Sequence, residues 1–162
     1  MALNEDLDFE GGADATVKGA FIREKIMAKE LLPTGTRLYK WTQFPLAGKK
    51  GITPWWSFAD EHRLESGLVI PGIKQSEIYA ERLKVSQKDF ARAQAAVTKS
   101  WNQMDNLLMI VLLKPVWGFI GRASGQNFEE ESVDPDKKNV FWIGGAYQVW
   151  IPNLTTDDVK EI

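Results

Sequence analysis

Three short segments of the chain carry the side chains that could do chemistry. Residues 37–40 read Arg-Leu-Tyr-Lys and offer two cations, and residues 53–57 read Thr-Pro-Trp-Trp-Ser. Residues 144–150 read Gly-Gly-Ala-Tyr-Gln-Val-Trp, so that two glycines lead into an amide side chain. A cation can hold phosphates, an aromatic ring can stack on a planar ligand, and an amide or hydroxyl can orient a sugar. Together the segments predict a site for a ligand with phosphates and an amide-bearing aromatic ring.

The two cations of the first segment, Arg37 and Lys40, are expected on opposite faces of a strand. Thr36–Trp41 alternates in polarity and is rich in aromatic residues, which predicts a strand. On a strand Arg37 and Tyr39 share one face, whereas Lys40 points to the other. We therefore expect only one of the two cations to share a cleft with Gln148.

Seven tryptophans are many for a chain of 162 residues. Trp101, Trp117 and Trp142 lie in segments that we expect to be core. Trp55 and Trp56 follow a proline in an irregular stretch, and neighbours in an extended segment point to opposite faces. We expect one of this pair to be buried and the other to be offered to a ligand.

In this order the three segments resemble the three-motif layout of bacterial ADP-ribosyltransferase toxins and the related NAD-cleaving toxins. The resemblance implies an α+β domain with a curved or split antiparallel sheet flanked by helices, and a cleft that takes NAD as its substrate. It also implies a protein partner, either an acceptor of ADP-ribose or a cognate immunity protein.

The resemblance assigns a role to each motif residue. A residue of the first strand would bind the NAD phosphates, a tryptophan with Ser57 would frame the nicotinamide pocket, and Gln148 would act on the nicotinamide ribose. The candidate catalytic residues are Gln148 and Ser57, and the candidate NAD-binding residues are Arg37, Tyr39, Lys40, Trp55 and Trp56.

Two departures from the family's pattern bear on the reaction. The family usually has arginine directly after the aromatic residue, where this chain has Lys40, and transferases commonly have glutamate where this chain has Trp150. A missing glutamate undercuts transfer to a protein side chain more than NAD cleavage, because Gln148 can orient water or ribose without acting as a base. Transfer and hydrolysis both stay open.

Composition excludes several other chemistries. The chain has no cysteine, which removes disulfides, thiolate nucleophiles and zinc-thiolate sites. The single histidine, His62, lies in a polar run and cannot supply clustered imidazoles, so no metal site is expected. A net charge of −2 without a long basic run gives no field for nucleic acid.

The N-terminal end is acidic and carries a Gly-Gly pair, which predicts a flexible arm over residues 1–13 before a single globular domain over 14–162. It lacks the basic and apolar regions of a signal peptide, and the longest apolar run, Leu107–Leu113, is too short to span a bilayer. We therefore expect a soluble protein made in the cytoplasm, and the absence of a signal peptide leaves open its delivery by a secretion system that needs none.

Several elements can be predicted around these segments. Good helix formers over Ala15–Leu32 favour a helix, residues 42–80 are rich in loop formers, and Ser86 with Asp89 forms a capping-box-like start of a second helix. That second helix would bury a stripe against the strand that follows, and the stripe consists of Phe90, Val97, Trp101, Met104 and Leu108.

The second half of the chain reads as strands. Apolar runs over Leu107–Leu113 and Val116–Ile120 predict two buried strands. Val140–Ile143 and Ala146–Ile151 flank two glycines and predict a hairpin.

Two other functions are compatible with the same residues. The absence of an unambiguous acid, base or nucleophile favours a non-catalytic module whose tryptophans bind a protein or carbohydrate. An accessory or immunity-type partner of a toxin is the other, and it would show a large exposed apolar patch instead of a cleft.

Overall fold

The computed structural model describes residues 1–13, 18, 20–21, 28–48, 51–95, 104, 106–124, 126–127, 141–142 and 146–162. The helices in these ranges are α1 (Phe9–Gly12), α3 (Ile73–Leu83) and α4 (Gln87–Ala95). The strands are β1 (Ala28–Leu32), β2 (Arg37–Thr42), β3 (Trp55–Phe58), β4 (His62–Arg63), β5 (Val69–Ile70), β6 (Asn106–Leu112), β7 (Val116–Arg122), β8 (Gln126–Asn127), β9 (Phe141–Trp142), β10 (Tyr147–Trp150) and β11 (Val159–Glu161).

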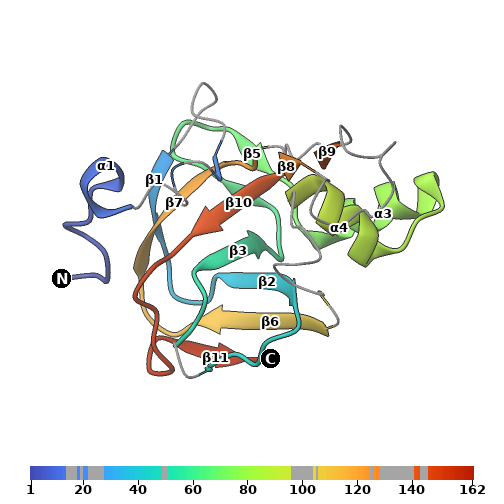
Figure 1. Cartoon of the computed structure of the whole chain (residues 1–162). Helices are drawn as coiled ribbons and strands as arrows, with labels where there is room; N and C mark the ends of the chain where they lie inside the picture. Colours follow the sequence, from blue (N-terminus) through green and yellow to red (C-terminus); the bar gives the residue numbers. More distant parts are fainter. Residues whose placement is uncertain are drawn as a thin grey trace.

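A curved seven-stranded sheet dominates the molecule (Figure 1). Its strand order is β1-β7-β10-β3-β2-β6-β11, and every neighbouring pair is antiparallel. The α3–α4 pair projects from one side of the sheet (Figure 1). The predicted α+β class with an antiparallel sheet is therefore confirmed, as are the predicted strands at β2, β6 and β7. No helix in the described ranges is long and apolar enough to cross a membrane.

The sheet changes partners within the four residues of β3. Trp55 and Trp56 pair with β10, whereas Ser57 and Phe58 pair with β2. The strand thus ties two half-sheets together, one on each side of the Trp56–Ser57 bond. The strands still form one continuous seven-stranded sheet, which changes partners at β3.

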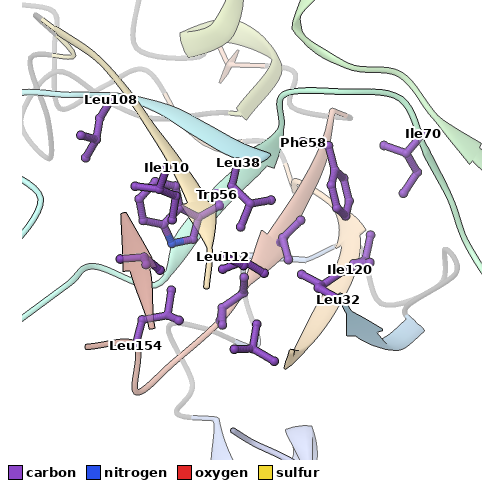
Figure 2. Packing of buried hydrophobic residues seen from close by; sticks show 14 of the residues in the cluster. Leu32, Leu38, Trp56, Phe58, Ile70, Leu108, Ile110, Leu112, Ile120 and Leu154 are labelled. Atoms are coloured by element: carbon purple, nitrogen blue, oxygen red, sulfur yellow. The ribbon is translucent and has the colours of Figure 1, made fainter. Parts of the chain in front are cut away.

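The main core lies on the concave face of this sheet. Leu32 comes from one end of the strand order and Leu112 from near the other, and both are fully buried in one cluster. Figure 2 shows their side chains converging with those of Leu38, Trp56 and Ile120. Because residues from both ends meet, the sheet curls far enough to enclose its own core, and apolar burial of this kind is the main stabilising term.

The predicted core around the helix that starts at Ser86 is wrong. The cap itself is present, since the Asp89 amide donates to the Ser86 hydroxyl at 3.1 Å. However, α4 contacts α3 and β9, and its half-buried Phe90 lies 6.3 Å from Tyr79. Because the sheet fills its own concave face, this helix is not needed to cover it.

The apolar stripe predicted for that helix also breaks up. Val97 and Trp101 lie outside the described residues. Met104 has a left-handed backbone with φ of 54°, and Leu108 lies on β6. A left-handed residue cannot continue an α-helix, so helical spacing was the wrong period for the end of the stripe.

The helix predicted over Ala15–Leu32 is wrong at its C-terminal end. Ala28–Leu32 forms β1, which pairs with β7 along all five residues, from Ala28 opposite Ile120 to Leu32 opposite Val116. The ladder with β7 outweighs the local helix propensity of these residues. Most of residues 14–27 lie outside the described ranges.

The loop-rich segment 42–80 contains a helix that the sequence did not reveal. In α3 only Ala80 is fully buried. The segment therefore has no apolar stripe from which a helix could be predicted. The helix ends at Lys84, whose backbone is left-handed with φ of 56°. The first half of the same segment also holds β3.

The predicted hairpin is also wrong. β9 pairs with β8, whereas β10 pairs with β7 on one side and with β3 on the other. β10 thus has a partner strand on each side, and neither partner is β9.

A second apolar cluster lies on the opposite, convex face of the sheet, where residues from the N-terminal part of the chain pack. Phe9 in α1 is buried there with Phe21, Phe119 and Trp150, and Trp55 packs against them. The division into an arm over 1–13 and a domain over 14–162 stays a prediction, with Phe9 as an anchor of the proposed arm on the sheet.

We predict that Gly72→Ala destabilises the protein by about 1–3 kcal/mol, the usual cost of overpacking. A methyl group at Gly72 would lie 2.5 Å from the Ala59 carbonyl oxygen, where the first turn of α3 meets the end of β3. Urea unfolding measures the loss. Gly48→Ala is the control, because a methyl group there meets nothing within 4 Å. An equal effect of both changes would contradict the steric explanation.

Candidate functional site

Gln148 and Ser57 lie on the same, convex face of the sheet. Trp150 pairs with Trp55, so both point the same way, and Gln148 and Ser57 are each two residues away from one of them. The β10–β3 ladder stops at Val149–Trp56, one step before Gln148 would meet Ser57. The candidate residues therefore lie on either side of the split in the sheet.

Gln148 is held by the backbone of another segment. Its Nε2 donates to the Ala20 carbonyl oxygen at 2.9 Å. Gln148 pairs with Gly121 on β7, and since glycine has no side chain the amide can reach across β7. No hydrogen bond joins Gln148 to Ser57 within the described ranges.

Ser57 belongs to a group of three hydroxyls. Tyr39 lies opposite Ser57 in the β2–β3 ladder, and the hydroxyls of Ser57 and of Ser76 in α3 are close enough to stabilise its ionised form. Burial raises the pKa of the Tyr39 hydroxyl, and the two serine contacts partly oppose this shift. Tyr39 therefore stays protonated at neutral pH.

The two adjacent tryptophans separate as predicted. Trp56 points into the main core and is only 2% exposed, so it cannot frame a ligand pocket. Trp55 is half-buried on the convex face, with its ring centroid 5.3 Å from Phe21 and 6.5 Å from Trp150. Of the pair, Trp55 is thus the candidate for ligand stacking.

Arg37 shares the convex face with Tyr39 and Ser57 but is already paired. Its guanidinium donates through Nε to Asp60 at 2.8 Å and through Nη2 to the other oxygen of the same carboxylate. This contact raises the pKa of Arg37 and lowers the pKa of Asp60. A phosphate bound here would compete with Asp60 for the guanidinium.

Lys40 points to the opposite, concave face, as the register of β2 predicted. Its Nζ lies 3.7 Å from the centroid of the Trp56 ring and donates to the Thr53 carbonyl oxygen at 2.9 Å. Burial lowers the pKa of Lys40 to about 7, even though the ring face and the oxygens of Thr53 favour the charged amine. Lys40 therefore edges the core and does not share a face with Gln148, so the register argument selects Arg37.

We predict that Lys40 makes the protein more stable as pH rises from about 7 to 9. Above its folded pKa of about 7 the native protein releases the Lys40 proton, whereas the unfolded chain keeps it up to the ordinary value of 10.5. The unfolded state then binds more protons, and the free energy of unfolding increases with pH. Urea unfolding at several pH values measures this slope. Lys40→Met should reduce it, and Lys160→Met, at an exposed position on β11, should not.

His62 is not the solvated residue that its polar neighbours indicated. Its ring stacks on Phe58 with centroids 4.2 Å apart and planes at 4°. Burial lowers its pKa, so the imidazole is neutral at pH 7 and packs as an aromatic side chain.

One described concavity lies elsewhere, beside the N-terminus. It has a volume of about 490 Å³ and is lined by Met1, Ala2, Leu3, Lys114, Pro115 and Asp158. None of the candidate residues lines it.

Sequence reasoning missed four residues that contact the candidate site. Ser76 comes from the unpredicted α3, and Asp60 pairs with Arg37. Ala20 and Phe21 reach Gln148 and Trp55. The negative charge of Asp60 was the only signal in the sequence, because a carboxylate is a common partner for an arginine such as Arg37. The Ala20 contact left no signal, because it is made by the backbone.

Comparisons with known proteins add little beyond overall shape. No family model matches the chain, and no curated protein matches it. The solved structure of Tne2 in complex with Tni2 aligns at a TM-score of 0.48 and 11% identity, over 88% of this chain and 92% of that one. The structure of Tse6 in complex with Tsi6 aligns at a TM-score of 0.43 and 12% identity, over 95% and 88%. Similarity this low carries no inference about function, which we argue from the side chains.

Proposed function

We propose that the protein is an NAD-consuming bacterial toxin or effector domain that cleaves the bond between nicotinamide and ribose. In hydrolysis, NAD⁺ and water give nicotinamide, ADP-ribose and a proton. In transfer, a nucleophile of a protein acceptor takes the place of water. The replacement of a family glutamate by Trp150 favours hydrolysis.

The placement of Gln148 supports this proposal most directly. It shares the convex face with Ser57 and Trp55, although Gln148 is about 90 residues away from them in the sequence. A polar amide, a hydroxyl and a half-buried indole on either side of a split sheet suit a ligand with a sugar and a planar ring. A shared site requires these residues to lie on one face of the sheet, whereas an accidental match of the motifs does not.

Each residue then has a chemical task. Trp55 would stack on a ring of the dinucleotide, and Arg37 would hold the pyrophosphate after exchanging Asp60 for it. Gln148 would orient the ribose as the glycosidic bond breaks. Ser57, with Tyr39 behind it, would frame the nicotinamide pocket.

A toxin of this kind requires protection of the cell that makes it. We include in the proposal a cognate immunity protein as partner and delivery by a secretion system independent of a signal peptide. Transfer would add a protein acceptor as a further partner.

The test is incubation of the purified protein with NAD⁺ and separation of the products. Free ADP-ribose with nicotinamide supports hydrolysis, and labelled protein after incubation with labelled NAD⁺ and a bacterial lysate supports transfer. Expression in a bacterial host should also slow growth and lower total NAD. Stable NAD with the purified protein and in the host, together with no labelled protein, would refute the proposal.

One observation favours the alternative of a non-catalytic interaction module. Ile78, Tyr79 and Leu83 are exposed on α3, with Val85 just beyond it. Such apolar side chains suit a protein contact. A well-tolerated protein that leaves NAD intact and retains one partner in a pull-down would favour this function.

A further inference from the structure

The bond between Gln148 and Ala20 fixes the direction of the Gln148 amide. A carbonyl oxygen can only accept a hydrogen bond, so the NH₂ end of the amide must face Ala20. The acceptor end, Oε1, is therefore turned away from Ala20. No hydrogen bond to Oε1 occurs among the residues that the structure describes.

The Ala20 carbonyl is itself held in place. Its oxygen also accepts from the Ser124 amide at 2.9 Å, and Phe21 forms an antiparallel bridge with Ala123. The Phe21 ring is only 3% exposed and lies 5.3 Å from the Trp55 ring. Backbone pairing and aromatic packing together place this carbonyl beside β7.

We propose that the Ala20–Phe21 segment positions Gln148 so that its side chain presents Oε1 to the substrate as a hydrogen-bond acceptor. The identity of the substrate rests on the function proposed above. The group that meets Oε1 must then be a donor, such as a hydroxyl or an amide N–H. A phosphate oxygen would be repelled there.

Gln148→Glu tests the orientation through its pH profile. In this variant an ionised carboxylate would place an acceptor against the Ala20 carbonyl, whereas a protonated carboxyl group would donate to it and leave its C=O outward, as the amide does. Gln148 is half-buried, and partial burial beside a carbonyl oxygen raises the pKa of such a carboxyl group. The neighbours Gly121 and Ala20 carry no charge, and Arg122 of β7 faces the concave side with Tyr147.

The expected result is a gain of activity on acidification. At pH 7 the Gln148→Glu variant should cleave NAD no faster than Gln148→Ala, and near pH 5 it should exceed Gln148→Ala by about ten-fold. The parent should show no such gain. Full activity of Gln148→Glu at pH 7 that falls at pH 5 would overturn the proposal, because an ionised group would then serve.

A second readout does not depend on catalysis. The folded pKa of the introduced carboxyl group exceeds its unfolded value, so the native state holds the extra proton and its stability falls as pH rises. Gln148→Glu should therefore unfold more easily than the parent at pH 7 and approach it near pH 5. An equal difference at both pH values would overturn the positioning. If the parent does not cleave NAD, the proposed function fails, while this measurement still decides the orientation.

Phe21→Leu tests the role of the segment. In the parent it should lower turnover, because the ring anchors the carbonyl that holds Gln148. In the Gln148→Ala background it should have no further effect on turnover, since the amide it positions is already missing. Additive losses would contradict the proposal. If Phe21→Leu does not fold, the unfolding measurement on Gln148→Glu decides alone.

Discussion

Gln148→Ala should lower the turnover of NAD cleavage by about 100-fold, the effect of losing one polar contact that strengthens in the transition state. The KM should change little, because Trp55 and Arg37 supply the binding contacts in both the ground state and the transition state. Steady-state kinetics of nicotinamide release separate the two parameters.

The matched control is Gln87→Ala, the same truncation in the first turn of α4. It should retain the kcat and KM of the parent. A rise in KM without loss of kcat in Gln148→Ala would show that the amide only binds, and an unchanged kcat/KM would remove Gln148 from the site.

Trp56→Ala should destabilise the fold by about 3–5 kcal/mol, the usual cost of truncating a large buried aromatic side chain. The ring is 2% exposed in the main core, and Lys40 lies over its face. The indole Nε1 has no hydrogen-bond partner among the described residues, so the loss arises from packing and not from a broken hydrogen bond. Urea unfolding measures the change.

Leu107→Ala provides the comparison, because Leu107 lies on β6 with 42% of its surface exposed. It should cost well under half as much as Trp56→Ala. A small loss from Trp56→Ala, comparable to that of Leu107→Ala, would contradict the central place of Trp56 in the core.

Local alternation made the faces of β2 and β3 predictable. Because side chains on a strand point alternately to its two faces, the sequence separated Arg37 from Lys40 and Trp55 from Trp56. The cap at Ser86 was also predictable from local sequence, because its hydrogen bond spans only three residues.

Long-range pairing was not predictable. The glycines before β10 suit a tight turn, but β10 lies between β3 and β7. The sequence of residues 140–151 does not indicate that these strands are its partners. The helix α3 lacks an apolar stripe. The contact of Gln148 with Ala20 uses a main-chain oxygen, which every residue has.

The shared strand β3 also restricts how related sequences can differ in length. Inserting one residue between Trp56 and Ser57, or deleting one residue of β3, would turn the side chains on one side of the change to the other face of the sheet. An indole would leave the core or a hydroxyl would enter it. We therefore expect homologues to accept gaps between β2 and β3, and to conserve the length of Trp55–Phe58 even where the residues themselves are replaced.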